Sequence, residues 1–180
     1  MSVQPHTRTR KWLSGPRRHT LVTAHIAGSV ALLGTAAGLL VTGAYAASRD
    51  PAEAHTIYKL SQLLVFSLDI PFAVVALISG VWLSVASKWG LFGYWWVVGS
   101  LAFLLATILI GAVVIGLSLK SALDATGQGN APGSAQWLLV LAPALQLPML
   151  LGATILGVFK PFGPISRSSG SSAVSGSSQD

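Results

Sequence analysis

Asp69 is the residue whose type and position most clearly suggest chemistry. It stands in an apolar run between Lys59 and Lys88 that holds no other charged residue. An aspartate near the centre of a membrane helix costs about 2.5 to 3.5 kcal/mol on insertion scales, and such residues commonly mark a proton or ion pathway. Desolvation favours the neutral carboxyl, so we expect Asp69 to be protonated at rest.

Three uncharged polar residues are expected at the depth of Asp69. Asp69 and Gln146 each stand ten residues inside an apolar run, which is roughly 15 Å along a helix. Thr35 and Thr107 fall within about one helical turn of that level in their own runs. We therefore expect these four residues to form an intramembrane polar layer, with the Asp69 carboxyl hydrogen-bonded to Gln146.

Two roles are open for this layer. The carboxyl could belong to a proton or cation relay, or it could be a neutral group that helps the helices find their register. Pro71, Pro143 and Pro148 stand near the layer. Because proline removes a helical hydrogen bond, these residues could kink their helices and favour a small cavity.

Histidines supply the candidate metal ligands, namely His25 and His55. His55 has Asp50 and Glu53 close by and could form an external metal site, although a solvated loop explains the same residues. His25 could equally lie at the level of the lipid headgroups. A haem needs an axial pair at one depth, and these two histidines are expected on opposite sides of a membrane. We predict no metal and no cofactor within one chain, while a site shared across a homodimer stays open.

Motifs of soluble enzymes are missing from the sequence. There is no phosphate-binding glycine loop, no GxSxG and no HExxH. The chain also has no cysteine, so thiolate chemistry is excluded. We therefore do not predict an enzyme.

The amino-acid composition indicates which kind of fold holds these candidate residues. Of the 180 residues, 52% are hydrophobic and 9% are charged, against about 25% charged in typical soluble domains. So few charges cannot cover a soluble surface, and a hydrocarbon core of roughly 30 Å needs about 20 apolar helical residues. The apolar runs predict an all-α polytopic membrane protein whose four transmembrane helices form an antiparallel bundle, at about 21–46, 60–86, 94–118 and 136–159.

Charge distribution predicts the orientation. Eight lysines and arginines are expected on the side of both termini and three on the other, which predicts a bacterial cytoplasmic membrane protein with cytoplasmic ends. The expected aromatic belts are Trp12, Trp89, Tyr94, Trp95, Trp96 and Phe159 inside, and Tyr45, Tyr58 and Trp137 outside. We expect the basic N-terminal arm to meet anionic lipid rather than nucleic acid.

The predicted organisation has three parts: a basic N-terminal arm (1–19), the transmembrane domain (20–160) and a Ser/Gly-rich disordered tail (161–180). The arm, the first apolar run and Ala44-Tyr45-Ala46 together imitate a cleavable signal sequence, but the run is longer than a signal requires, so we expect an uncleaved helix. Small residues should mark the helix contacts, and the glycines expected there are Gly28, Gly34, Gly38 and Gly80.

Three short motifs carry a resemblance to known families. They are the run from His25 to Gly34, the segment Ala46-Ala-Ser-Arg-Asp-Pro51, and Leu68-Asp69-Ile-Pro71. The chain resembles small integral membrane proteins of bacteria, actinobacteria in particular, whose function is unknown, and is distantly similar to the copper-resistance D membrane domain. That similarity would imply a metal-linked role for His25, but the additional Met and His ligands expected for copper are missing.

The sequence leaves three functions open. The first is a non-enzymatic membrane component that acts through a membrane protein partner or as a homo-oligomer. The second is a proton- or cation-linked transporter or channel subunit that uses Asp69. The third is a haem or quinone redox module.

Overall fold

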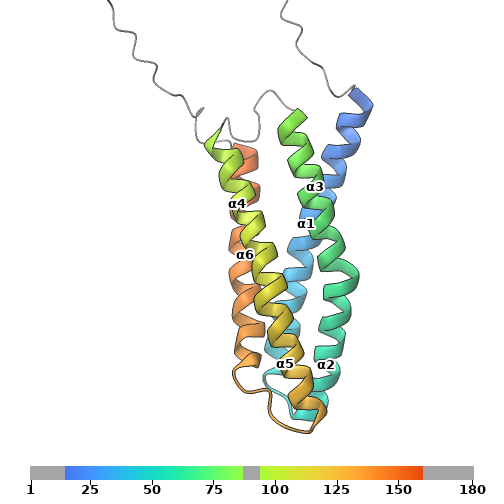
Figure 1. Cartoon of the computed structure of the whole chain (residues 1–180), viewed down its shortest axis with the longest axis vertical. Helices are drawn as coiled ribbons and strands as arrows, with labels where there is room; N and C mark the ends of the chain where they lie inside the picture. The colour runs from blue at the N-terminus through green and yellow to red at the C-terminus, as the bar shows by residue number, and fades with distance from the viewer. Residues whose placement is uncertain (1–14, 87–93, 160–180) are drawn as a thin grey trace, which may run out of the picture.

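The structure is a computed structural model in which residues 15–86 and 94–159 are described. Four long helices run antiparallel to one another, which confirms the predicted all-α bundle (Figure 1). Each is long and apolar enough to cross a membrane. The elements are α1 (Gly15–Ala46), α2 (Pro51–Leu64), the π-helical η1 (Val65–Asp69), α3 (Ile70–Ala86), α4 (Trp95–Leu109), the π-helical η2 (Ile110–Ile115), α5 (Gly116–Gly127) and α6 (Ala135–Phe159).

The helices are longer than the predicted spans. The second begins at Pro51 rather than near residue 60, and the third ends at Gly127 rather than near residue 118. The first begins at Gly15, about six residues before its predicted start. Charged residues mark where a helix leaves hydrocarbon and not where it stops. The 36 residues of Pro51–Ala86 span roughly 50 Å, well beyond the 30 Å of hydrocarbon.

Capping hydrogen bonds and turn residues explain where the second helix begins and the third helix ends. The Asp50 side chain accepts hydrogen bonds of 3.0 Å from the backbone N–H groups of Ala52 and Glu53, and Pro51 occupies the first helical turn, as is usual at a helix start. At the end of α5, Gly129 has a φ of 77°. Its N–H and that of the next residue bond back to α5 carbonyls, which is a Schellman ending.

The bundle has an even number of antiparallel helices, so the first helix begins and the last helix ends at the same end of the bundle. The α1–α2 and α5–α6 turns lie at one end, and the start of α1, the end of α3, the start of α4 and the end of α6 lie at the other (Figure 1). Within the bundle α1 packs against α2, α3 and α6, and α4 packs against α6. The N-terminal arm up to residue 14, Trp12, Trp89 and the predicted tail lie outside the described residues.

One aromatic residue lies elsewhere than predicted. Tyr45 and Trp137 are exposed near the turn end, and Trp95 and Phe159 near the other, in accord with interfacial belts. Tyr58, by contrast, is 0% exposed and belongs to the core between α2, α5 and α6. The α2 extension is the reason: it is covered by α5, so a position expected at the interface is enclosed.

Candidate functional site

The polar layer is centred on the contact between Thr35 and Asp69. Thr35 is buried on α1 and its Oγ1 donates a 3.0 Å hydrogen bond to Oδ1 of Asp69, the last residue of η1. The same Oγ1 lies 3.0 Å from the carbonyl oxygen of Leu32. A hydroxyl has one hydrogen and can also accept. Thr35 can therefore donate to an ionised Asp69, or accept from a protonated Asp69 while donating to Leu32.

Gln146 and Thr107 form the other half of the layer. Gln146 is 3% exposed and its Nε2 donates a 3.0 Å hydrogen bond to the backbone carbonyl of Thr107. The expected Asp69–Gln146 bond is therefore replaced by two separate bonds, one on each side of the layer. The Thr107 hydroxyl is buried without a hydrogen-bond partner among the described residues, and such a group is costly to leave unpaired.

Gly111 of η2 lies where the two halves meet. A Cβ at this position would stand 3.3 Å from Nε2 of Gln146 and 3.7 Å from Oδ2 of Asp69. The carboxyl and the amide therefore face the same small space, which exists because residue 111 has no side chain. Gly111 belongs to the same stripe as Thr107 on the third helix.

Both π-helical turns occur at the level of the layer. η1 ends at Asp69 and η2 begins one residue before Gly111. Pro71 explains the first turn, because it has no N–H for the carbonyl of Ser67 and its ring crowds that carbonyl. The glycine at the start of η2 weakens the regular helix there. π-Turns inside α-helices are frequent at functional sites. Sequence reasoning missed them, although Pro71 was a signal for the first.

Apolar residues enclose the layer on both sides. Toward the turn end lies the larger core cluster, which includes Leu39, Val65 and Ile115. Toward the other end lies a smaller cluster, which includes Leu32, Ala76 and Leu150. The polar groups are thus held between two apolar blocks, where electrostatic and hydrogen-bond interactions are strongest.

The glycines predicted at helix contacts divide into two groups. At Gly28 a Cβ would stand 3.3 Å from the backbone nitrogen of Ala76, so α1 and α3 approach closely there. At Gly80 it would stand 2.8 Å from the His25 ring. At Gly34 and Gly38 it would meet no atom within 4 Å. The structure therefore shows no close approach of another helix at Gly34 or Gly38, in contrast to Gly28 and Gly80.

The ring of His25 is half-buried and packs against α3. Its Nδ1 lies 3.0 Å from the carbonyl oxygen of Ala76 and 3.2 Å from Oγ of Ser79. The ring therefore rests on α3 in the space that Gly80 leaves open. This contact ties the start of the first helix to α3.

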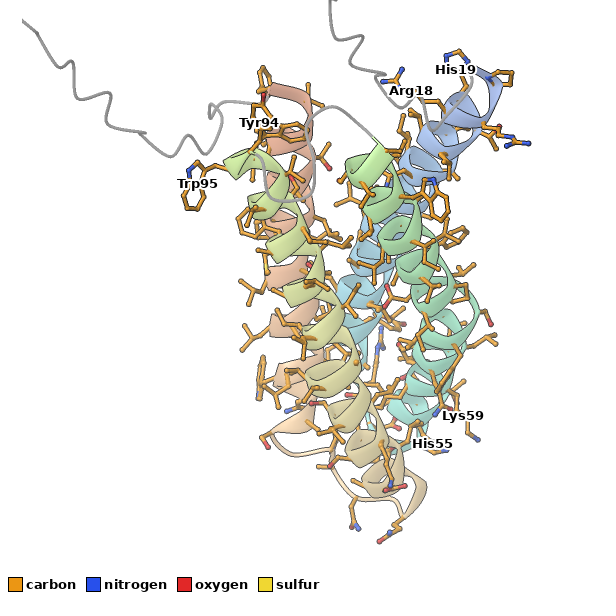
Figure 2. All side chains as sticks on the ribbon, turned by 45° about the horizontal axis from the view of Figure 1, so that its top comes forward. Arg18, His19, His55, Lys59, Tyr94 and Trp95 are labelled. Carbon is orange, nitrogen blue, oxygen red and sulfur yellow. The ribbon has the colours of Figure 1, made fainter. Side chains whose placement is uncertain are left out.

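His55 lies at the opposite end of the bundle, near Lys59, whereas Arg18 and His19 lie at the end of Tyr94 and Trp95 (Figure 2). Its Nδ1 is 2.9 Å from Oγ1 of Thr126.

The two carboxyl groups near His55 have other partners. Asp50 caps α2, and Glu53 is 3.8 Å from Arg49. Within residues 15–86 and 94–159 no three His, Cys, Asp or Glu residues come together as a metal site.

Comparison with known families agrees with this architecture. The sequence model of a family described as "Predicted integral membrane protein (DUF2269)" matches residues 19–161. The chain belongs to this family. The matched segment contains all four helices of the bundle, apart from the first turn of α1, and every residue of the polar layer. The family description names a membrane protein and no activity. No curated protein and no solved structure matches the chain.

Proposed function

We propose that this DUF2269 protein is a non-enzymatic component of the bacterial cytoplasmic membrane that binds and releases a proton at Asp69. The observation that carries the proposal is the position of the Thr35 hydroxyl, 3.0 Å from both Asp69 Oδ1 and the Leu32 carbonyl. This geometry satisfies an ionised and a protonated carboxyl without moving a heavy atom. A site with only a structural role needs to satisfy one state.

A proton suits the layer better than a metal cation. The space beside Gly111 is bordered by the Asp69 carboxyl and by the Nε2 amide group of Gln146. Hard cations select oxygen ligands, and the Nε2 group of Gln146 is a hydrogen-bond donor with no lone pair to offer a cation. A neutral carboxyl or a carboxylate next to an N–H donor meets no such conflict.

Infrared spectroscopy of the protein in lipid tests proton binding directly. A pH titration of the wild type should show the C=O stretch of a protonated carboxyl that disappears as the site ionises, and Asp69→Asn should abolish this band. Asp124→Asn is the matched control, since Asp124 is exposed on α5. Persistence of the same band, distinct from those of the exposed carboxyl groups, in a lipid-inserted, folded Asp69→Asn protein would contradict the proposal.

A stronger form of the proposal is that Asp69 takes part in proton transport across the membrane, in addition to binding a proton. Proton flux into liposomes, followed with a pH-sensitive dye, should be present for the wild type and for Asp124→Asn and lost for Asp69→Asn. If the infrared band is present and flux is absent, Asp69 binds a proton without conducting it, and the protein acts as a membrane component whose partner remains to be isolated.

The membrane orientation is also proposed, with both termini in the cytoplasm. The excess of basic residues at that end supports it. Because the chain has no cysteine, single cysteines can be placed at will. Ser48→Cys and Ser134→Cys, in the two turns, should react with a membrane-impermeant maleimide in intact cells. His19→Cys should react only after permeabilisation, and the reverse pattern would overturn the orientation.

Retention of the first helix is part of the proposal. Thr35 of α1 supplies the hydrogen bond to Asp69, so the proton site needs this helix. N-terminal sequencing of membrane-extracted protein should not find a start at Ala47.

The other predictions keep their own tests. A homo-oligomer or a membrane protein partner would appear as a larger complex in mild detergent, and contact of the basic arm with anionic lipid would appear as salt-sensitive vesicle binding. The haem alternative requires a Soret band in the purified protein. The likeness to the copper-resistance D domain carries no copper site over to this chain, because the additional Met and His ligands expected for copper are missing from the sequence.

A further inference from the structure

A small cavity lies in the half of the bundle between the polar layer and the turn end. Its volume is about 10 Å³, and its lining comes from all four long helices: Leu39, Gly43, Tyr58, Ser61, Ile115, Leu119, Leu139 and Pro143. This volume is close to the lower limit for one water molecule. A cavity of this size stays dry when its walls are apolar and is hydrated when two or more polar groups face it.

The first polar group at the cavity is the Tyr58 hydroxyl. Tyr58 is 0% exposed, and its hydroxyl oxygen has no hydrogen-bond partner among the described residues. Buried tyrosine hydroxyls ordinarily find a partner. A water molecule in the cavity that the same residue lines would supply this partner.

The second polar group is the backbone carbonyl of Leu139. In a regular helix it would accept from the N–H of residue 143, but residue 143 is proline and has no N–H. Gly43 of α1 lies directly against this carbonyl, since a Cβ there would stand 2.5 Å from the Leu139 oxygen. The carbonyl is thus directed toward α1, where Gly43 also lines the cavity.

A third group completes the site. Ser61 lines the cavity, and its Oγ donates to Oγ1 of Thr42 at 3.0 Å. Thr42 in turn donates to the Gly38 carbonyl at 3.0 Å. With its hydrogen engaged, Ser61 Oγ offers a lone pair to a further donor.

We propose that this cavity is a binding site for a single buried water molecule that joins α1, α2 and α6. The water accepts from the Tyr58 hydroxyl and donates to the Leu139 carbonyl and to Ser61 Oγ. Three hydrogen bonds are what a buried water typically makes. The site is distinct from the polar layer, because the residues that line the cavity do not include Thr35, Asp69, Thr107 or Gln146.

Proton-detected solid-state NMR of the full chain in lipid bilayers tests the site through magnetisation transfer from water to the Leu139 and Gly43 amides. We expect transfer in the wild type and its loss in Tyr58→Phe, which removes the hydroxyl. Pro143→Ala should also abolish it, because the restored N–H satisfies the Leu139 carbonyl within the helix. Neither change introduces a larger side chain, so both variants should fold.

Two matched controls keep the experiment specific. Tyr45→Phe makes the same change at an exposed tyrosine, and Pro148→Ala makes the same change at the other proline of α6. Both should retain the transfer. The proposal is overturned if the folded wild type shows no transfer at Leu139, or if the transfer survives unchanged in both Tyr58→Phe and Pro143→Ala. Direct coupling of the Tyr58 hydroxyl to the Leu139 carbonyl would likewise overturn it.

Discussion

The hydroxyl of Thr35 and the carboxyl of Asp69 are 3.0 Å apart and join α1 to the π-helical turn of the second long helix. Within the described part of the chain, Thr35 is the hydrogen-bond partner of the carboxyl. The carboxyl therefore depends on one neighbour, and this dependence can be measured.

Thr35→Val should lower the stability of the bundle and shift the infrared C=O stretch of Asp69. The variant keeps the shape of threonine and removes the hydroxyl, so we expect a loss of about 0.6 to 1.7 kcal/mol in unfolding free energy. The infrared C=O stretch of protonated Asp69 should move to higher frequency, because the carboxyl has lost its partner. Thr35→Ser should restore both values. Thr154→Val is the control, since Thr154 bonds only within α6, and an equal band shift there would count against the assignment.

Gly43→Ala should be strongly destabilising, whereas Gly38→Ala on the same helix should not. The added Cβ at residue 43 would stand 2.5 Å from the backbone oxygen of Leu139, which cannot rotate away, and we expect a cost of about 1 to 3 kcal/mol. At residue 38 the space is open, so alanine should be neutral or stabilising by at most about 1 kcal/mol. Thermal unfolding in one detergent compares the two, and similar melting temperatures would show that α1 does not pack on α6 as described.

His25 and Gly80 should be energetically coupled. Gly80→Ala places a Cβ 2.8 Å from the His25 ring and would displace it from the Ala76 carbonyl. In a His25→Ala background the same change has no ring to displace. A double-mutant cycle of unfolding free energies should therefore give a coupling of about 0.5 to 3 kcal/mol. Additive effects would mean that the ring does not occupy the space above Gly80.

Asp50→Ala should cost about 1 kcal/mol, the usual loss for an N-cap residue. The reason is that the Ala52 and Glu53 N–H groups lose their acceptor. Hydrogen exchange at these two amides should rise more than elsewhere in α2. Asp124→Ala, at an exposed position inside α5, serves as the comparison. Unchanged exchange in Asp50→Ala would show that the Asp50 side chain does not cap the helix.

Sequence reasoning could predict a common depth for the polar residues, because depth in a membrane helix follows from counting. Each helical residue rises about 1.5 Å, which predicts one level for Asp69, Gln146, Thr35 and Thr107. Their bonding pattern could not be counted in this way. Asp69 and Gln146 both lie next to Gly111, but each bonds to a different neighbour, because side-chain pairing depends on the rotation of each helix about its axis.

The sequence by itself determined the number, order and composition of the helices, because burial in hydrocarbon demands long apolar runs and every backbone group must be satisfied within its own helix. The tertiary structure alone decided the ends of the second and third helices, the burial of Tyr58 and the open space beside Gly34 and Gly38. Each of these depends on which face of a helix meets which neighbour. Lipid tails are as apolar as the helix surfaces, so the hydrophobic effect does not select which faces meet. Close packing and polar contacts across the bundle select them instead.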